Sequence, residues 1–525
     1  MCAAGDQLEK KLGQRVEYQG YYGTVRFVGE LAELPGSWIG VEWDDSARGK
    51  HDGSHNGVSY FKTRHPMSGS FVRPAKLNFG ISCVEATCRR YGKVEGPMAG
   101  VDKSVIADLK REFNIPFIEM VGFEKVNSQQ SQFANLRVVH LRGEPVNGAG
   151  EKNELVSVCP LVTELIISKT LLSSWETVCD ITGQLKNLAL LDVSDNKIPV
   201  PSEEKLEEFA EAFKPLSHII INNLEYDWDE VLICSKMWLS VITLSAQSNK
   251  IHKLSSPPIC VLSNLTSLYL QDNPIKYWDN VNKLGNLQSL QLLHLGGTGL
   301  TNIFFPGEVH TSLFPSLKIL NLPNNEINDW NSVNELNKLI LLENLLLHLN
   351  PIMETPKSFD TVVARVKSLK KLNLTVITPQ ERKASEFDYM KRHGREWLLA
   401  INDSVLLRDF YSQHPRFSEL IESHGTLTAD DFPNIPTSLK SRLINIKIFC
   451  PNCPDIQVFQ KRVPKNMTVQ KLSGLVQKLI NTEGSVPSLR AISAKAPDVD
   501  VLLEKDMQDL SYYSIEDGDS IAVSW

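Results

Sequence analysis

A frame of apolar and polar positions recurs along the middle of the chain. In Leu188–Ile198 the first, fourth, sixth and eleventh positions are apolar and the ninth is asparagine, while the other positions take residues of any type. The same frame returns at Leu265–Ile275, Leu317–Ile327 and Leu342–Ile352. Less regular copies lie at Val162–Leu172, Leu216–Tyr226, Leu239–Ile251, Leu290–Leu300 and Leu369–Ile377. One copy could arise by chance, but four indicate a repeat.

The frame is that of the leucine-rich repeat, which it resembles in length and in the placement of its asparagine. The starting positions 162, 188, 216, 239, 265, 290, 317, 342 and 369 lie 23 to 28 residues apart, so each short strand should be followed by a helix in an α/β solenoid. The asparagines should stack as a ladder that satisfies buried backbone groups: Asn196, Asn273, Asn325 and Asn350. Thr170, Leu224 and Thr298 take that place in other copies and should interrupt the ladder.

The concave sheet of such a solenoid is the expected binding face. The residue inside each apolar-free-apolar triplet points outward, and Thr243 is expected there in its repeat. Several outward residues are more apolar than a solvated sheet needs, although single exposed apolar residues are common. The candidate contacts are Ile220, Tyr269, His294 and Leu346. A row of tryptophans, Trp175, Trp278 and Trp330, recurs in register, which favours packing beneath the helices over a binding role.

Short β-type runs alternate with glycine-rich turns in residues 8–80, which predicts a small all-β barrel. The loop Gly49-Lys50-His51-Asp52-Gly53 can take positive φ and bring backbone N–H groups close to a ligand. Trp38, Trp43 and Phe61 supply apolar walls. Together these features suit capture of a chain end that carries a carboxylate and an aromatic ring. The alternative is that the aromatic residues form the barrel core and that Lys50 is solvated.

This segment resembles the CAP-Gly domain, whose hallmark is Gly-Lys-Asn-Asp-Gly. The resemblance implies binding of acidic C-termini that end in Glu-Glu-Tyr or Phe, as on α-tubulin and some microtubule-tip proteins. Lys50 and His51 would then meet the terminal carboxylates, Trp38 would line the groove beside Trp43, and Arg73 would add a second cation. His51 replaces the hallmark asparagine, and its charge can change near neutral pH.

Residues 440–525 read as strand, strand, helix, strand, strand, which resembles the α+β ubiquitin-like (β-grasp) fold. The last residues are Ser524 and Trp525 where ubiquitin has Gly-Gly, so a docking role is expected. Cys450-Pro-Asn-Cys453 could be half of a zinc site or a redox pair. Because structural zinc needs four ligands and no second such pair lies nearby, a turn between strands is favoured.

Length and composition fit a multidomain protein. The 525 residues suggest about three domains, which we place at 8–80, 131–400 and 440–525. A linker and solenoid cap are expected at 81–130, and a helical linker at 401–439. The formal net charge of −7 argues against a nucleic-acid binder. The sequence offers no signal peptide or membrane-spanning run, and its 9 cysteines fit reduced thiols in the cytoplasm.

This order of modules resembles the tubulin-specific chaperone E family over essentially the whole chain. The resemblance implies binding to α-tubulin and the αβ-tubulin heterodimer. It also implies heterodimer assembly and dissociation with the other tubulin-folding cofactors (B, C and D), in the cytoplasm and cytoskeleton. Since the sequence has no Walker loop, dinucleotide fingerprint or nucleophile elbow, we expect no enzyme activity, cofactor or metal. The alternatives are a microtubule-end scaffold, or a ubiquitin-pathway adaptor that delivers tubulin to the proteasome.

Overall fold

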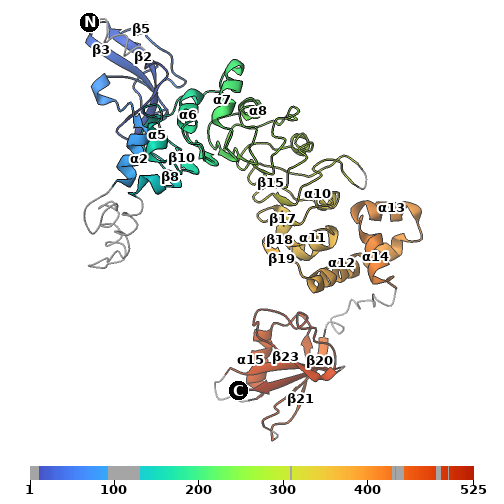
Figure 1. The fold of residues 1–525 in the computed structure, drawn as a ribbon. Helices are drawn as coiled ribbons and strands as arrows, with labels where there is room; N and C mark the ends of the chain where they lie inside the picture. The colour runs from blue at the N-terminus through green and yellow to red at the C-terminus, as the bar shows by residue number, and fades with distance from the viewer. Residues whose placement is uncertain are drawn as a thin grey trace. The chain divides into compact units, whose positions relative to one another are not determined.

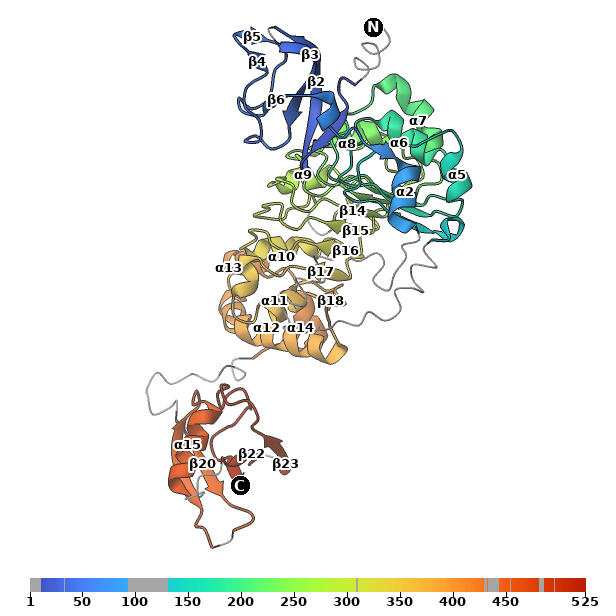
Figure 2. The same cartoon turned by 90° about the vertical axis from the view of Figure 1, so that its left-hand side faces the viewer.

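The computed structural model describes residues 11–32, 34–92, 131–307, 310–428, 432, 443–453, 455–480, 486–494 and 496–525. The chain divides into compact units, Met1–Thr426 and Leu427–Trp525. The first unit holds a β module followed by a solenoid, and the second is an α+β domain (Figures 1 and 2). Most of the linker expected at 81–130 and part of that expected at 401–439 lie outside the described residues.

The N-terminal module is built on an antiparallel sheet of order β1-β2-β3-β6. These strands are β1 (Arg15–Tyr18), β2 (Tyr21–Leu31), β3 (Leu34–Trp43) and β6 (Gly69–Val72). β4 (Ser54–His55) and β5 (Val58–Ser59) pair separately, and η1 (Pro74–Lys76) follows the sheet. Strand alternation buries Val16, Val25, Ile39, Val41 and Trp43 in one core. The module is therefore the small all-β fold that the sequence predicts.

The solenoid stacks short parallel strands of two or three residues into one sheet, and its helices lie on one side of that sheet (Figure 2). Its strands are β8 (Val138–His140), β10 (Glu164–Ile166), β11 (Leu190–Asp192), β12 (His218–Ile220), β13 (Thr243–Ser245), β14 (Ser267–Tyr269), β15 (Leu292–His294), β16 (Ile319–Asn321), β17 (Asn344–Leu346) and β18 (Lys371–Leu372), with β19 (Thr375–Val376) antiparallel at the end. The helices between them are α5 (Glu154–Val158), α6 (Trp175–Thr182), α7 (Leu206–Ala212), α8 (Trp228–Ser235), α9 (Trp278–Asn282), α10 (Trp330–Leu336) and α11 (Ser358–Arg365). Short 3-10 turns lie at η2 (Phe133–Asn135), η3 (Glu203–Lys205) and η4 (Pro351–Glu354).

The expected outward position of Thr243 is wrong by two residues. Thr243 pairs with His218, whereas Ser245 pairs with Ile220 and Tyr269. The frame of this repeat begins at the buried Val241, which is 1% exposed, and not at Leu239, which is 62% exposed, so Ser245 is the residue equivalent to Ile220.

The asparagine ladder is present and is more continuous than the sequence suggests. Asn273 is fully buried, and its amide nitrogen donates to the carbonyls of Ala246 and Leu270 at 2.9 and 3.1 Å. Its Oδ1 accepts from the N–H groups of Asn249 and Ile251 at 3.0 and 3.3 Å. Asn249 thus belongs to the ladder, at the regular asparagine position of the frame that begins at Val241.

The interruptions expected at Thr170 and Thr298 are wrong. The Thr298 hydroxyl lies 2.9 Å from the Leu295 carbonyl and 3.1 Å from Asn325 Oδ1, and Thr170 makes the equivalent contacts. A threonine hydroxyl can therefore replace the asparagine amide in this turn. Leu224 has no polar side-chain atom, so the interruption expected there is confirmed.

The tryptophan row packs in the core as expected. Trp175, Trp228, Trp278 and Trp330 are each the first residue of a helix, and the first three are at most 2% exposed. The indole of Trp175 donates to the Tyr226 hydroxyl at 3.0 Å, two repeats along the solenoid. These large side chains thereby tie neighbouring repeats together.

Both ends of the solenoid are capped by helices. β7 (Ile81–Ser82) pairs with β9 (Val146–Gly148), and α2 (Cys83–Tyr91) joins the solenoid core. At the other end α12 (Pro379–Ala400) packs on α11. Arg382 of α12 donates to the carbonyl of Val363 in the last turn of α11 and to that of Leu369 beyond it. α13 (Ser404–Gln413) and α14 (Phe417–His424) pack on α12. The C-terminal end of the solenoid is therefore closed by α12.

The C-terminal unit has a mixed sheet of order β21-β20-β24-β22-β23 that packs on α15 (Val469–Leu479). The strands are β20 (Leu443–Phe449), β21 (Phe459–Pro464), β22 (Ser488–Ser493), β23 (Ala496–Leu502) and β24 (Ser520–Ser524). β23 is the strand that the sequence analysis missed. Cys450 and Cys453 lie in the turn after β20, where Cys453 N donates to the Cys450 carbonyl at 3.3 Å.

The ladder predicts a large effect of one buried amide on stability. Asn273→Ala leaves four buried backbone groups without their partners, which should lower the free energy of unfolding by at least about 3 kcal/mol. Urea denaturation followed by circular dichroism measures this loss. Asn286→Ala is the control, because Asn286 is an exposed asparagine of the same repeat, and it should change stability by less than about 0.5 kcal/mol. Equal effects of the two substitutions would contradict the ladder's role.

Candidate functional site

A groove of about 500 Å³ on the N-terminal module gathers the predicted site residues. It is lined by Tyr18, Gln19, Leu31, Leu34, Trp38, Trp43, Arg48, Lys50, His51, His55, Ser70, Phe71, Val72, Arg73 and Lys76. Among these lining residues there is no Asp or Glu, so the groove carries a local positive potential beside aromatic walls. Trp38, Trp43, Lys50, His51 and Arg73 all line it. Phe61 does not; it packs behind the groove against His51 and Phe71.

The glycine loop is held by its backbone against β6. A Cβ on Gly49 would lie 2.3 Å from the Met67 carbonyl oxygen, and a Cβ on Gly53, at φ +100°, would lie 2.1 Å from that of Phe61. The N–H groups of Lys50 and His51 both donate to the Gly69 carbonyl, at 2.7 and 3.2 Å. The loop glycines are therefore required, but the prediction that these N–H groups are offered to a ligand is wrong.

Lys50 and His51 present their side chains differently. Lys50 is exposed and forms no ion pair within the part of the chain that the structure describes, so its ammonium group is available. His51 stacks on Phe71, with ring centroids 4.8 Å apart, and its Nδ1 accepts from Gly53 N–H at 3.0 Å. Burial lowers the pKa of His51. The ring is therefore neutral near pH 7, carries its proton on Nε2 and can donate a hydrogen bond as an asparagine amide would.

Arg73 and Arg48 are fixed on aromatic rings. The guanidinium of Arg73 lies 3.8 Å from the centroid of the Trp38 ring and donates to the carbonyls of Pro35 and Ser37 at 2.8 and 3.2 Å. Arg48 lies 5.2 Å from the centroid of Trp43. Preorganised cations of this kind bind carboxylates without losing further side-chain freedom. The sequence analysis missed Arg48; its place next to Gly49 in the loop was the available signal.

The candidate contacts of the concave face lie in one row across the sheet, where Tyr269 and His294 are on neighbouring strands while Ser245 and Asn321 separate them from Ile220 and Leu346. Ile220, Tyr269, His294 and Leu346 are each partly buried on the outward side of their strands. The rings of Tyr269 and His294 are 6.2 Å apart. His294 Nδ1 accepts from Gly296 N–H at 3.2 Å, and burial lowers the pKa of His294. These residues form a mixed apolar and polar surface suited to protein contact.

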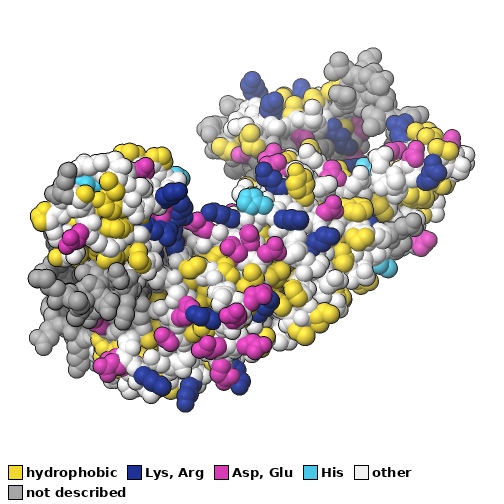
Figure 3. Space-filling model, turned by 90° about the horizontal axis from the view of Figure 1, so that it is seen from above, with side chains coloured by type: hydrophobic (Ala, Val, Ile, Leu, Met, Phe, Trp, Pro, Cys, Tyr) yellow, Lys and Arg dark blue, Asp and Glu magenta, His cyan; other side chains and the backbone are white. Residues whose placement is uncertain are grey.

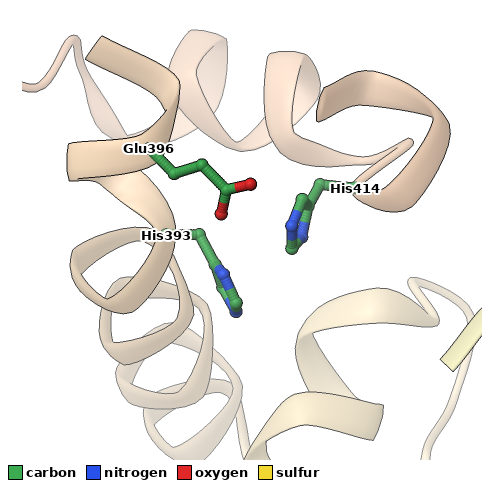
Figure 4. Close-up of side chains that lie close together, drawn as sticks. All are labelled: His393, Glu396 and His414. Atoms are coloured by element: carbon green, nitrogen blue, oxygen red, sulfur yellow. The ribbon is translucent and has the colours of Figure 1, made fainter. Parts of the chain in front are cut away.

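His393, Glu396 and His414 come together in the C-terminal cap in an arrangement that could hold a metal ion (Figure 4). Their potential ligand atoms lie within 4.8 Å of one another. However, His414 Nδ1 already contacts the Tyr389 hydroxyl at 2.5 Å, and a guanidinium nitrogen of Arg365 lies 3.5 Å away. A cation next to this guanidinium would be repelled. The arrangement favours neutral, packed imidazole rings over a metal centre.

These buried rings predict acid sensitivity of the first unit. Burial lowers the pKa of His393 to about 4 and that of His414 to about 3, so between these values and the unfolded pKa of about 6.5 the unfolded chain binds more protons. The stabilising contribution is complete above pH 6.5 and is lost as pH falls towards 4. Thermal unfolding at pH 7.5 and 5 should show the drop, and His393→Gln should reduce it. His310→Gln, at an exposed histidine, should leave this loss of thermal stability between pH 7.5 and pH 5 unchanged. If the two variants lose the same stability, the buried histidines of the cap are not its source.

Comparison with known proteins extends these observations to the whole chain. A family model described as the CAP-Gly domain matches residues 12–77. The tubulin-specific chaperone E of Mus musculus is 37% identical over 523 residues, and that of Homo sapiens 36% identical over 529 residues; each match covers 98% of both chains. The solution structure of the C-terminal ubiquitin-like domain of mouse tubulin-specific chaperone e is 38% identical and covers 17% of this chain and 93% of its own, with a TM-score of 0.16.

The fold classes are thus a CAP-Gly module, a leucine-rich repeat solenoid and a ubiquitin-like domain. Within the described residues, no helix has both the length and the apolar character needed to cross a membrane. With relatives above 30% identity aligned over nearly their full length, the chain belongs to the tubulin-specific chaperone E family.

Proposed function

We propose that this protein is a tubulin-folding cofactor. It binds α-tubulin and takes part, with cofactors B, C and D, in assembly and dissociation of the αβ-tubulin heterodimer in the cytoplasm. The observation that carries the proposal is the groove of the N-terminal module, where cations and aromatic rings meet with no acidic side chain among the lining residues. Family membership supports the identity of the partner.

The groove chemistry suits an acidic C-terminal tail that ends in an aromatic residue. In this proposal the ammonium group of Lys50 pairs with the terminal carboxylates and His51 Nε2–H donates a hydrogen bond to them. The terminal ring packs beside Trp38, and Arg73 holds a second carboxylate. Charge-assisted hydrogen bonds of this kind are stronger than neutral ones.

The concave face supplies the second contact. Once the tail is bound, the folded body of α-tubulin meets Ile220, Tyr269, His294 and Leu346 at high effective concentration. Dissociation of the heterodimer then requires tighter binding to separated α-tubulin than to the intact dimer. The proposed activity is binding without catalysis, since the sequence offers no phosphate-binding loop.

The groove is tested with an acidic peptide that ends in Glu-Glu-Tyr. Lys50→Ala should weaken its binding about tenfold, because a charge-assisted contact is worth ~1.4 kcal/mol or more. Isothermal titration calorimetry on the full chain measures the dissociation constant. Lys62→Ala is the matched control, since Lys62 is exposed on the same module but outside the groove lining. If both variants bind like the unchanged chain, Lys50 has no role in tail capture.

The effect on tubulin is tested by size-exclusion chromatography with light scattering. Purified heterodimer mixed with this protein, alone and with the other cofactors, should lose intact dimer and yield a complex with α-tubulin. If the dimer stays whole while the protein sediments with microtubules, the scaffold alternative replaces the proposal. Removal of residues 427–525, the separate C-terminal unit, should leave peptide binding intact. If the deletion instead abolishes delivery of tubulin to the proteasome, that result supports the adaptor alternative.

A further inference from the structure

The N-terminal module is joined to the solenoid by a very short connection. Leu77 still belongs to the core of the module, whereas Ile81 already pairs with Val146 of β9 in the solenoid cap. Between them, Gly80 has φ +98°, and a Cβ there would lie 2.6 Å from the Pro145 carbonyl oxygen. The side-chain amide of Asn147 also donates to the Phe79 carbonyl at 2.6 Å. The connection therefore keeps the module close to the solenoid cap.

Charged side chains bridge the two parts beyond this connection. Lys197, in the loop after β11, lies 3.4 Å from Asp44 of the module and 3.4 Å from Glu225 in the loop after β12. Arg64 of the module reaches Glu225 at 3.7 Å. We call Asp44, Arg64, Lys197 and Glu225 the junction network. In the space-filling view, Lys and Arg side chains gather beside Asp and Glu side chains where the module's lobe meets the solenoid (Figure 3).

The junction network is anchored on both sides. Within the module, Arg15 binds Asp44, and Arg64 also lies 3.3 Å from Glu42. Within the solenoid, Lys250 lies 2.7 Å from Glu225. Lys250, Lys197 and Arg64 together hold the pKa of Glu225 below its usual value. Asp44 therefore contacts Arg15 of the module and Lys197 of the solenoid. Glu225 likewise contacts Lys250 of the solenoid and Arg64 of the module.

The junction is open and carries charged side chains from both parts. The cores of the module and of the solenoid are separate clusters. Hollows of about 490 and 330 Å³, both lined by Arg15, Lys197 and Glu225, lie between the two parts. The four side chains of the junction network are between 27% and 49% exposed. Ion pairs at such exposure are weak and are screened by salt.

We infer that the junction network is a salt-sensitive latch that fixes the direction in which the tail-binding groove faces relative to the concave sheet. Its module side lies at the end of β3, where Glu42 and Asp44 flank Trp43, a residue of the groove lining. Closing the latch therefore orients the groove itself. The consequence for tubulin rests on the proposed function: with the latch closed, the tail and the body of the same tubulin molecule can be held together.

Zero-length cross-linking of the full chain tests the latch without any mutation. A carbodiimide condenses the Lys197 amine with the Asp44 carboxylate into an amide when they are in contact, and the reagent takes up the water that is lost. At about 50 mM NaCl the peptides carrying these residues should be found joined. At about 500 mM the yield should fall at least threefold relative to the Lys370–Glu343 product. That control pair is kept adjacent by the solenoid backbone at either salt concentration, since the Lys370 N–H donates to the Glu343 carbonyl at 2.7 Å. Absence of the Asp44–Lys197 product beside an abundant control product, or a yield independent of salt, would overturn the latch.

Matched charge reversals test its consequence. Lys197→Glu repels both Asp44 and Glu225, whereas Lys250→Glu repels Glu225 from within the solenoid. Lys197→Glu should leave binding of the Glu-Glu-Tyr peptide within about twofold but weaken binding of whole tubulin about tenfold, through lost effective concentration. Lys250→Glu should change tubulin binding by less than about threefold. Equal effects of the two variants on tubulin would refute the orienting role. If the unchanged chain fails to bind the peptide, the proposed function fails, and the cross-linking result still decides the latch.

Discussion

The structure depends on satisfying the buried backbone groups in the turns that follow the solenoid strands. Each strand is only three residues long, so sheet hydrogen bonds alone leave the chain between strand and helix without partners. Asn196, Asn273 and Asn325 supply both donors and acceptors to these turns. An unpaired buried N–H or C=O would cost about 1–3 kcal/mol, and this cost would recur in every repeat. The ladder is therefore the condition under which the leucine columns can pack.

The rigid column in turn determines how the other parts are attached. Its ends would expose apolar core, and α2 and α12 cover them. Because α2 follows the N-terminal module after a short connection, capping the solenoid also places the module. The solenoid cap is apolar and the junction beside it is charged, so a permanent attachment lies next to a contact that salt can weaken. Function on such a scaffold follows from the relative placement of two binding faces more than from either face alone.

The sequence predicts those features that repeat or that use special backbone geometry. The repeat frame locates the strands, the tryptophans and most of the ladder, and Gly49 and Gly53 mark the binding loop. Prediction from the sequence fails where a different functional group makes the same hydrogen bond, as the Thr298 hydroxyl does in place of an asparagine amide. It also fails where the decisive partner is distant in sequence. The neutral state of His51 depends on Phe71 and on the Gly53 N–H, and Lys197 meets Asp44 only in the folded chain.

Strand alternation also explains how a chain of net charge −7 can offer a cationic groove to an acidic tail. Glu42, Trp43 and Asp44 are consecutive, so the indole faces one side of the sheet and both carboxylates face the other. On that other side Glu42 is 3% exposed and paired with Arg26 and Arg64, while Asp44 is paired with Arg15 and Lys197. The carboxylates of Glu42 and Asp44 are thus neutralised behind the groove, and Arg48, Lys50, Arg73 and Lys76 act together on its open side. Under the proposed function, recognition of an acidic tail depends on this local field, which the overall charge does not reveal.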